Sequence, residues 1–103
     1  MDQPLEEVIQ NHSGLLFLLF AGGGSEEEEH SRLAAREAVA AQPPEARALF
    51  MEVCLSSWTD VAASQGVHGV PAILVFKNGR LLLRRLGRTD GSTLSRLVAQ
   101  AQA

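Results

Sequence analysis

The sequence offers few residues whose types support nucleophilic or metal chemistry. It has one cysteine, Cys54, a run of four glutamates, Glu26–Glu29, and three histidines, His12, His30 and His68. With one thiol, no intramolecular disulfide can form and a zinc site built from several cysteines is excluded. The histidines fall on different predicted elements and none has the spacing of a metal-binding pair. We therefore predict no metal and no other cofactor.

Cys54 has two interpretations. It falls near the end of a predicted strand, and a lone cysteine is most often a small buried hydrophobic residue. Reactive thiols need an electropositive setting, whereas neighbouring Glu52 is expected to raise the pKa of this thiol. We therefore expect Cys54 to be buried and to lie away from the glycine-rich loop over residues 21–25. The alternative is a surface thiol that pairs between chains or is modified by oxidants.

The glutamates and the serine before them have a structural explanation. Ser25 followed by Glu28 is the pattern of a helix capping box. Carboxylates in the first helical turn interact favourably with the helix dipole, so the acidic run needs no bound ligand. A nucleophilic serine needs a nearby base, and no His or Lys is in obvious reach of Ser25 by sequence. We interpret Ser25 as a helix cap and assign it no catalytic role.

Length and composition predict one globular domain over residues 1–103. The chain has 103 residues, of which 46% are hydrophobic and 20% are charged, which suffices for a single core. Its longest strongly apolar run, Leu15–Ala21, is too short to cross a bilayer, and no basic segment precedes it. We therefore predict no membrane association and a reducing, cytoplasmic location.

The net charge of −3 conceals a gradient along the chain. Residues 1–30 contain seven acidic residues and no Lys or Arg, whereas residues 66–103 contain six basic residues and one acidic residue, Asp90. Such an asymmetry can steer a charged partner, but we interpret the two segments as solvated faces whose charges partly compensate each other in the folded protein. Nucleic-acid binding is disfavoured because the chain is acidic overall and has no aromatic platform among its arginines.

A β-hairpin is the strongest structural signal. Asn78-Gly79 separates two apolar runs, Ala72–Phe76 and Leu81–Leu86, and an Asn-Gly pair suits a type I′ turn because both of its central residues need positive φ. Pro71 has no N–H and therefore marks the entrance of the first strand.

The rest of the chain alternates between helices and strands. Periodicity and caps predict the order α-β-α-β-α-β-β-α. A strand-helix-strand unit implies right-handed parallel pairing of the first two strands. The predicted elements are helices over residues 4–12, 26–41, 57–63 and 90–101 and strands over 15–20, 49–55, 72–76 and 81–86.

These features resemble the thioredoxin family. The similarity extends from about Leu15 onward and rests chiefly on VHGVP at residues 67–71, FKNG at residues 76–79 and the glycine before the last helix. It implies an α/β thioredoxin-like fold with a mixed sheet of about four strands, flanked by helices and lacking the family's usual first strand. It also implies a cis Val70-Pro71 peptide bond. Without that first strand, the strand over residues 49–55 lies at a sheet edge, which is either shielded by the first helix or used to form a homodimer.

The resemblance also indicates what this chain has lost. The family's Cys-Gly-Pro-Cys motif aligns with Gly24, Ser25, Glu26 and Glu27, and its buried aspartate aligns with Leu18. Because both thiols and the buried acid are absent together, we predict that the protein is not a dithiol-disulfide oxidoreductase.

A binding surface does not depend on those thiols. The resemblance implies a groove for protein or extended peptide, and the residue before the cis-proline offers backbone groups to a peptide there. We therefore predict a non-catalytic adaptor module; the alternatives are a thiol sensor or oxidoreductase acting through Cys54 and a structural domain of a larger assembly. The groove residues are Gly22, Gly23, Gly24, Val70, Pro71, Leu86, Gly87 and Arg88.

Overall fold

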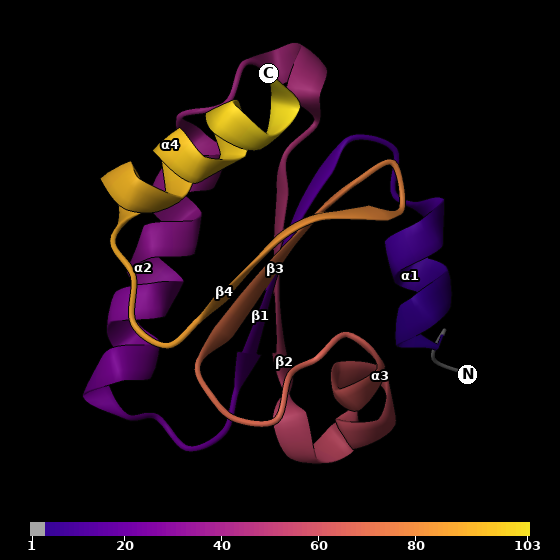
Figure 1. Ribbon diagram of the computed structural model, residues 1–103, viewed down its shortest axis with the longest axis vertical. Coiled ribbons are helices and arrows are strands. Elements are labelled where there is room, and N and C mark those ends of the chain that lie inside the picture. The colour runs from indigo at the N-terminus through magenta and orange to yellow at the C-terminus, as the bar shows by residue number, and fades with distance from the viewer. Residues whose placement is uncertain (1–3) are drawn as a thin grey trace.

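The computed structural model describes residues 4–103 and has the predicted order of elements (Figure 1). Asp2, one of the acidic residues counted above, lies outside the described residues. Two short 3₁₀ turns, at Pro44–Ala46 and Leu55–Ser57, were not predicted. The helices are α1 (Leu5–Asn11), α2 (Glu26–Ala40), α3 (Thr59–Ser64) and α4 (Gly91–Gln102), and the strands are β1 (Leu15–Ala21), β2 (Leu49–Cys54), β3 (Ala72–Lys77) and β4 (Arg80–Leu86).

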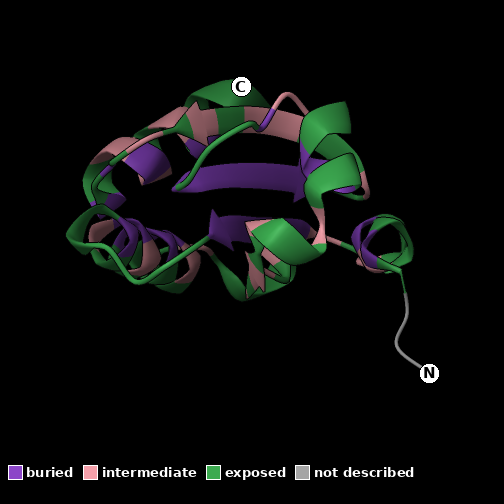
Figure 2. Cartoon of the chain, turned by 90° about the horizontal axis from the view of Figure 1, so that it is seen from below, coloured by how far each residue is buried: buried purple, intermediate pink, exposed green. Residues whose placement is uncertain are grey.

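The four strands form one mixed sheet in the order β2-β1-β3-β4. As predicted, β1 and β2 are parallel, while β3 is antiparallel to both β1 and β4. Figure 2 shows the strands as a central layer with helices on both sides. Strand β2 is an edge strand, as expected; dimerisation through this edge stays a prediction.

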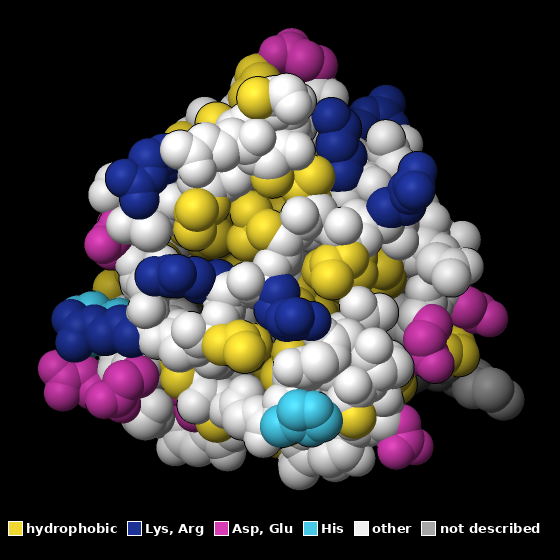
Figure 3. All heavy atoms as spheres, viewed as in Figure 1, with side chains coloured by type: hydrophobic (Ala, Val, Ile, Leu, Met, Phe, Trp, Pro, Cys, Tyr) yellow, Lys and Arg dark blue, Asp and Glu magenta, His cyan; other side chains and the backbone are white. Residues whose placement is uncertain are grey.

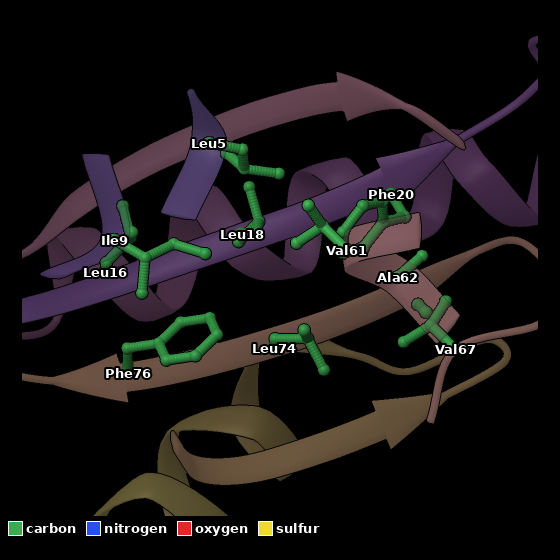
Figure 4. Packing of buried hydrophobic residues seen from close by; sticks show 11 residues of the cluster. Leu5, Ile9, Leu16, Leu18, Phe20, Val61, Ala62, Val67, Leu74 and Phe76 are labelled. Carbon is green, nitrogen blue, oxygen red and sulfur yellow. The ribbon is translucent and has the colours of Figure 1, made fainter. Parts of the chain in front are cut away.

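Strand β1 is the centre of the core because it is buried on both faces. Alternate residues of a strand point to opposite faces of the sheet. On one face, Leu16, Leu18 and Phe20 pack with residues of α1 and α3 (Figure 4). On the other, Phe17 and Leu19 pack with residues of α2 and α4. Every residue of β1 is buried, which explains its uninterrupted apolar sequence.

The hairpin and the proline step follow the sequence predictions. Asn78 and Gly79 have φ values of 51° and 83°, as a type I′ turn requires. The Val70-Pro71 peptide bond is cis. Within the described residues, no helix combines the length and apolarity needed to cross a membrane.

Candidate functional site

The glycine-rich loop after β1 is held by a glutamate from the first turn of α2. Glu28 is only 3% exposed, and its Oε1 accepts hydrogen bonds from the N–H groups of Gly24 at 2.8 Å and Gly23 at 3.1 Å. The Ser25 Oγ accepts a bond from the Glu28 N–H at 3.2 Å, so the predicted cap is confirmed. In a capping box the glutamate bonds the N–H of the cap residue itself. Here it reaches the two residues before the cap.

This arrangement changes the electrostatics of the loop. The hydrogen bonds from Gly24 and Gly23, which favour the charged carboxylate, hold the pKa of Glu28 below its ordinary value despite burial. In a thiol-active protein, the N-terminus of a helix stabilises a thiolate. Here a carboxylate of the same chain already occupies two of the loop amides, so those two are not free for a thiolate or a bound anion.

An ion-pair network ties α2 to the edge strand β2. The guanidinium of Arg32 donates to both carboxylate oxygens of Glu52, at 2.6 and 2.8 Å, and to Glu29 at 2.5 Å. Contact with Arg32 holds the pKa of Glu52 below its usual range, and the same bonds raise the pKa of Arg32. Arg32 could not be predicted as part of the site, because Arg32 and Glu52 are 20 residues apart and only the fold brings them together.

The expectations for Cys54 were wrong. Its side chain is exposed, and the strand register pairs it with Ala21, the residue at which the glycine-rich loop begins. The Sγ atom lies 3.1 Å from the Ser56 Oγ. This hydroxyl is the main cause of a lowered pKa of the Cys54 thiol, and the backbone of Ser56 adds to it, whereas the charge of Glu28 opposes it.

Cys54 is exposed and lies beside the loop because of its place in the sheet. Cys54 is the last residue of an edge strand, so a second strand flanks it on one side only. It lines a hollow together with Gly22, Gly23, Gly24 and Glu28. Parallel strands end at the same edge of the sheet, so the C-terminal residue of β2 lies beside the loop that follows β1. The nearby Ser56 was the one sequence signal of a perturbed thiol.

The structure brings the three segments of the predicted groove together. A Cβ atom on Gly22 would lie 3.1 Å from Cγ2 of Val70, and the Gly87 N–H donates to the Pro71 C=O at 2.9 Å. Gly23, Gly24 and Arg88 are exposed. Two apolar side chains also face solvent here, Val70 at 38% exposure and Leu86 at 56%.

The backbone of Val70 is available for binding. Neither its N–H nor its C=O forms a hydrogen bond with another residue in the described part of the chain. Strand β3 begins at Ala72, so Val70 lies just before the paired region. An extended peptide could hydrogen-bond to these groups as a short added strand.

His12, Trp58 and Leu18 have structural roles. The Nε2 atom of His12 lies 3.1 Å from the Leu15 C=O and 2.9 Å from the Arg47 C=O, which links α1 to the loop before β2. Trp58 is half-buried and packs against the core. Leu18, at the position of the family's buried acid, is fully buried among apolar side chains. Among residues 4–103 no three His, Cys, Asp or Glu side chains are grouped so that they could hold a metal.

Known structures share this architecture at low sequence identity. A mutant thioredoxin from Halobacterium salinarum NRC-1 is 19% identical, with a TM-score of 0.73, over 96% of this chain and 83% of that chain. Oxidised thioredoxin from Plasmodium falciparum is 18% identical, with a TM-score of 0.71, over 95% of this chain and 89% of that chain. A chain from a study of thiol resolution in a yeast mitochondrial 1-Cys peroxiredoxin is 16% identical, with a TM-score of 0.72, over 92% of this chain and 85% of that chain.

These matches define the fold as thioredoxin-like and α/β, as the sequence predicted. No protein-family model and no curated protein matches the sequence. Within this fold, the chain has a single cysteine, which is exposed, and no Cys-x-x-Cys motif.

Proposed function

We propose that this domain binds a segment of another protein in the groove formed by residues 22–24, 70–71 and 86–88 and does not catalyse dithiol-disulfide exchange. The observation that carries the proposal is the free backbone of Val70, flanked by exposed apolar side chains. Main-chain hydrogen bonds supply affinity in strand addition, and pockets for alternate side chains supply specificity. None of these contacts requires a thiol.

The absence of catalysis is supported by the chemistry of the loop. Dithiol exchange needs an attacking and a resolving thiol, and the sequence has one cysteine in all. The two positions that align with the family's cysteines are Gly24 and an exposed glutamate, Glu27. Glu28 engages the amides of Gly23 and Gly24.

Site-specific photo-crosslinking tests the groove. A Cβ atom at Gly23 or Gly69 would meet nothing within 4 Å, so a crosslinking side chain can replace either residue with little disturbance. We expect both to capture the same partners from a native lysate, whereas a crosslinker at the exposed Leu33 of α2 captures none of them. The variant Val70→Arg should abolish capture. Equal capture from all three positions would contradict the proposal.

The exposed thiol supports a second candidate function, modification of Cys54 by a low-molecular-weight disulfide. The Cys54 thiolate would attack one sulfur of the disulfide, form a mixed disulfide and release the other sulfur as a thiolate, so that no further oxidant is needed. The observations in its favour are the exposure of Cys54 and the Ser56 hydroxyl, which lowers the pKa of the thiol.

Alkylation and affinity capture separate the two functions. We expect iodoacetamide to label Cys54 in the folded protein, with a pH midpoint that rises in Ser56→Ala because a hydrogen bond to the thiolate is lost. If groove binding is the function, partners captured by the wild type are retained by Cys54→Ser with or without reductant. Loss of capture in Cys54→Ser or with reductant would favour the thiol function.

A further inference from the structure

We propose that the outer edge of β4 is a second binding site, which takes an extended segment of a partner protein rich in acidic and apolar residues. This site meets the groove of the proposed function at Leu86 and Arg88 and extends from there along the rest of β4. The segment would add as a fifth strand to the sheet, on the side opposite to β2.

The backbone of β4 is open on this side. Within the described residues β4 pairs with β3 alone. Leu86 lies opposite Ala72, and the bond from the Gly87 N–H to the Pro71 C=O lies just outside this pair. In antiparallel ladders, hydrogen-bonded and non-hydrogen-bonded pairs alternate, so the N–H and C=O of Leu86 point away from β3. By the same alternation, so do those of Arg84.

The charge of this edge is strongly positive and is not neutralised within the described chain. Within residues 4–103, no basic side chain of this edge lies within 4.0 Å of a carboxylate. Arg32, by contrast, forms ion pairs with Glu29 and Glu52. The Lys77 side chain donates to Gln102, and Arg84 donates to the Gln65 C=O. The Nε of Arg85 is buried and has no hydrogen-bond partner. The basic residues of β4 itself are Arg80, Arg84 and Arg85; Lys77 ends β3 opposite Arg80, and Arg88 follows two residues after β4.

Apolar side chains lie among these cations. Leu81 is 42% exposed and Leu86 is 56% exposed. Figure 3 views the molecule from the side on which β4 lies, and there Lys and Arg side chains surround exposed hydrophobic ones. A partner strand with acidic and apolar residues would meet complementary charge and apolar surface together.

Other occupants match the edge less well. A second copy pairing through β4 would bring its own arginines against these arginines, and like charges on paired strands are destabilising. A single-stranded nucleic acid would need aromatic side chains for stacking, and β4 has none. An anionic membrane would leave the free backbone groups of Arg84 and Leu86 unpaired, whereas an added strand satisfies them.

Fluorescence anisotropy with a defined probe tests this inference. The probe is a labelled ten-residue peptide of alternating Glu and Val, measured at about 0.15 M salt, where charges more than about 8 Å apart are largely screened. We expect binding to weaken on the order of tenfold or more in the double variant Arg80→Glu, Arg84→Glu, since charge pairs steer and hold such complexes. In Arg96→Glu, which changes an exposed charge on α4, binding should stay within about twofold because that residue lies outside the site. Circular dichroism checks that each variant is folded.

Strand addition requires more than charge, and two further measurements isolate it. The same peptide with every second amide N-methylated keeps its charges but cannot complete the ladder, so it should bind at least tenfold more weakly. Hydrogen exchange should show protection of the Arg84 and Leu86 amides on binding. The groove variant Val70→Arg should bind the probe at least as tightly as wild type, because it removes no group of β4 and adds a positive charge, and this separates failure of this site from failure of the groove.

Several results would overturn the proposal. If Arg96→Glu weakened probe binding as much as the double variant does, the peptide would be held by general charge attraction. If the methylated peptide bound as tightly as the unmethylated one, strand addition would be excluded. Binding to phosphatidylserine vesicles or single-stranded DNA without binding to the peptide would assign the patch to another partner. If nothing binds, the arginines only protect an open edge from aggregation.

Discussion

The start of α2 and the edge of β4 are both strongly charged, but the charges at α2 are paired within the chain and those at β4 are not. At α2, Glu28 is bound by loop amides, and Glu29 and Glu52 are bound by Arg32. At β4, no arginine forms an ion pair with a carboxylate of residues 4–103. Charge that is paired within the chain stabilises the fold, whereas charge that is unpaired at an open edge is available to a partner. Glu28 and Glu29 of the acidic run are therefore structural, and the basic strand β4 is the better candidate for an interface.

Removing the Glu28 carboxylate should produce the largest effect on stability. The variant Glu28→Ala leaves the amides of Gly23 and Gly24 without their acceptor, and hydrogen bonds to a charged group contribute about 1.5–3 kcal/mol. We expect the free energy of unfolding, measured by urea denaturation, to fall by about 2–3 kcal/mol. The control Glu27→Ala removes an exposed carboxylate of the same turn and should change it by about 0.5 kcal/mol at most. Equal effects would show that Glu28 acts only through the helix dipole.

The pH dependence of stability should report the same carboxylates. The pKa values of Glu28 and Glu52 are lowered in the folded protein from an ordinary value of 4.5. Below that pH the unfolded chain therefore binds more protons, and the free energy of unfolding decreases as the pH falls through the lowered values. The variant Glu28→Gln should show a shallower acid slope in urea titrations between pH 5 and about pH 2. An unchanged slope would mean that Glu28 does not contribute to acid unfolding.

The pairing of Arg32 with Glu52 should be measurable by a double-mutant cycle. With Arg32→Met and Glu52→Gln, we expect a coupling energy of about 1 kcal/mol, above the usual value for surface pairs because the contact is bidentate. The coupling should weaken as sodium chloride is added. A coupling energy near zero would show that this ion pair, like many surface ion pairs, does not stabilise the fold.

The β4 edge should contribute least to stability. Within residues 4–103 the Arg80 side chain forms no ion pair that the substitution Arg80→Glu would remove, so the free energy of unfolding should stay within about 0.5 kcal/mol of wild type. Thermal unfolding measured beside Arg32→Met gives the direct contrast between the two regions. A larger loss in Arg80→Glu than in Arg32→Met would reverse the comparison.

The sequence predicted the helices and strands better than it predicted which of their residues lie side by side in the fold. The strand over residues 15–20 was recognised because a short, continuous apolar run is typical of a strand that is buried on both faces. The Ser25 cap was recognised because capping depends on residues within one turn. The position of Cys54 was missed because its pairing with Ala21 depends on the register of two strands that lie 33 residues apart in sequence. Nothing local signals such a register.

Elements with local causes could be predicted from the sequence. The Asn78-Gly79 turn, the Ser25 cap and the apolar run of β1 follow from backbone sterics, hydrogen bonds within a turn and hydrophobic burial. The pairing of charges depends on the fold, because Arg32 and Glu52 meet through the packing of α2 on β2. The fold also decides that β4 is an edge and that Cys54 faces solvent, since both depend on where the sheet ends.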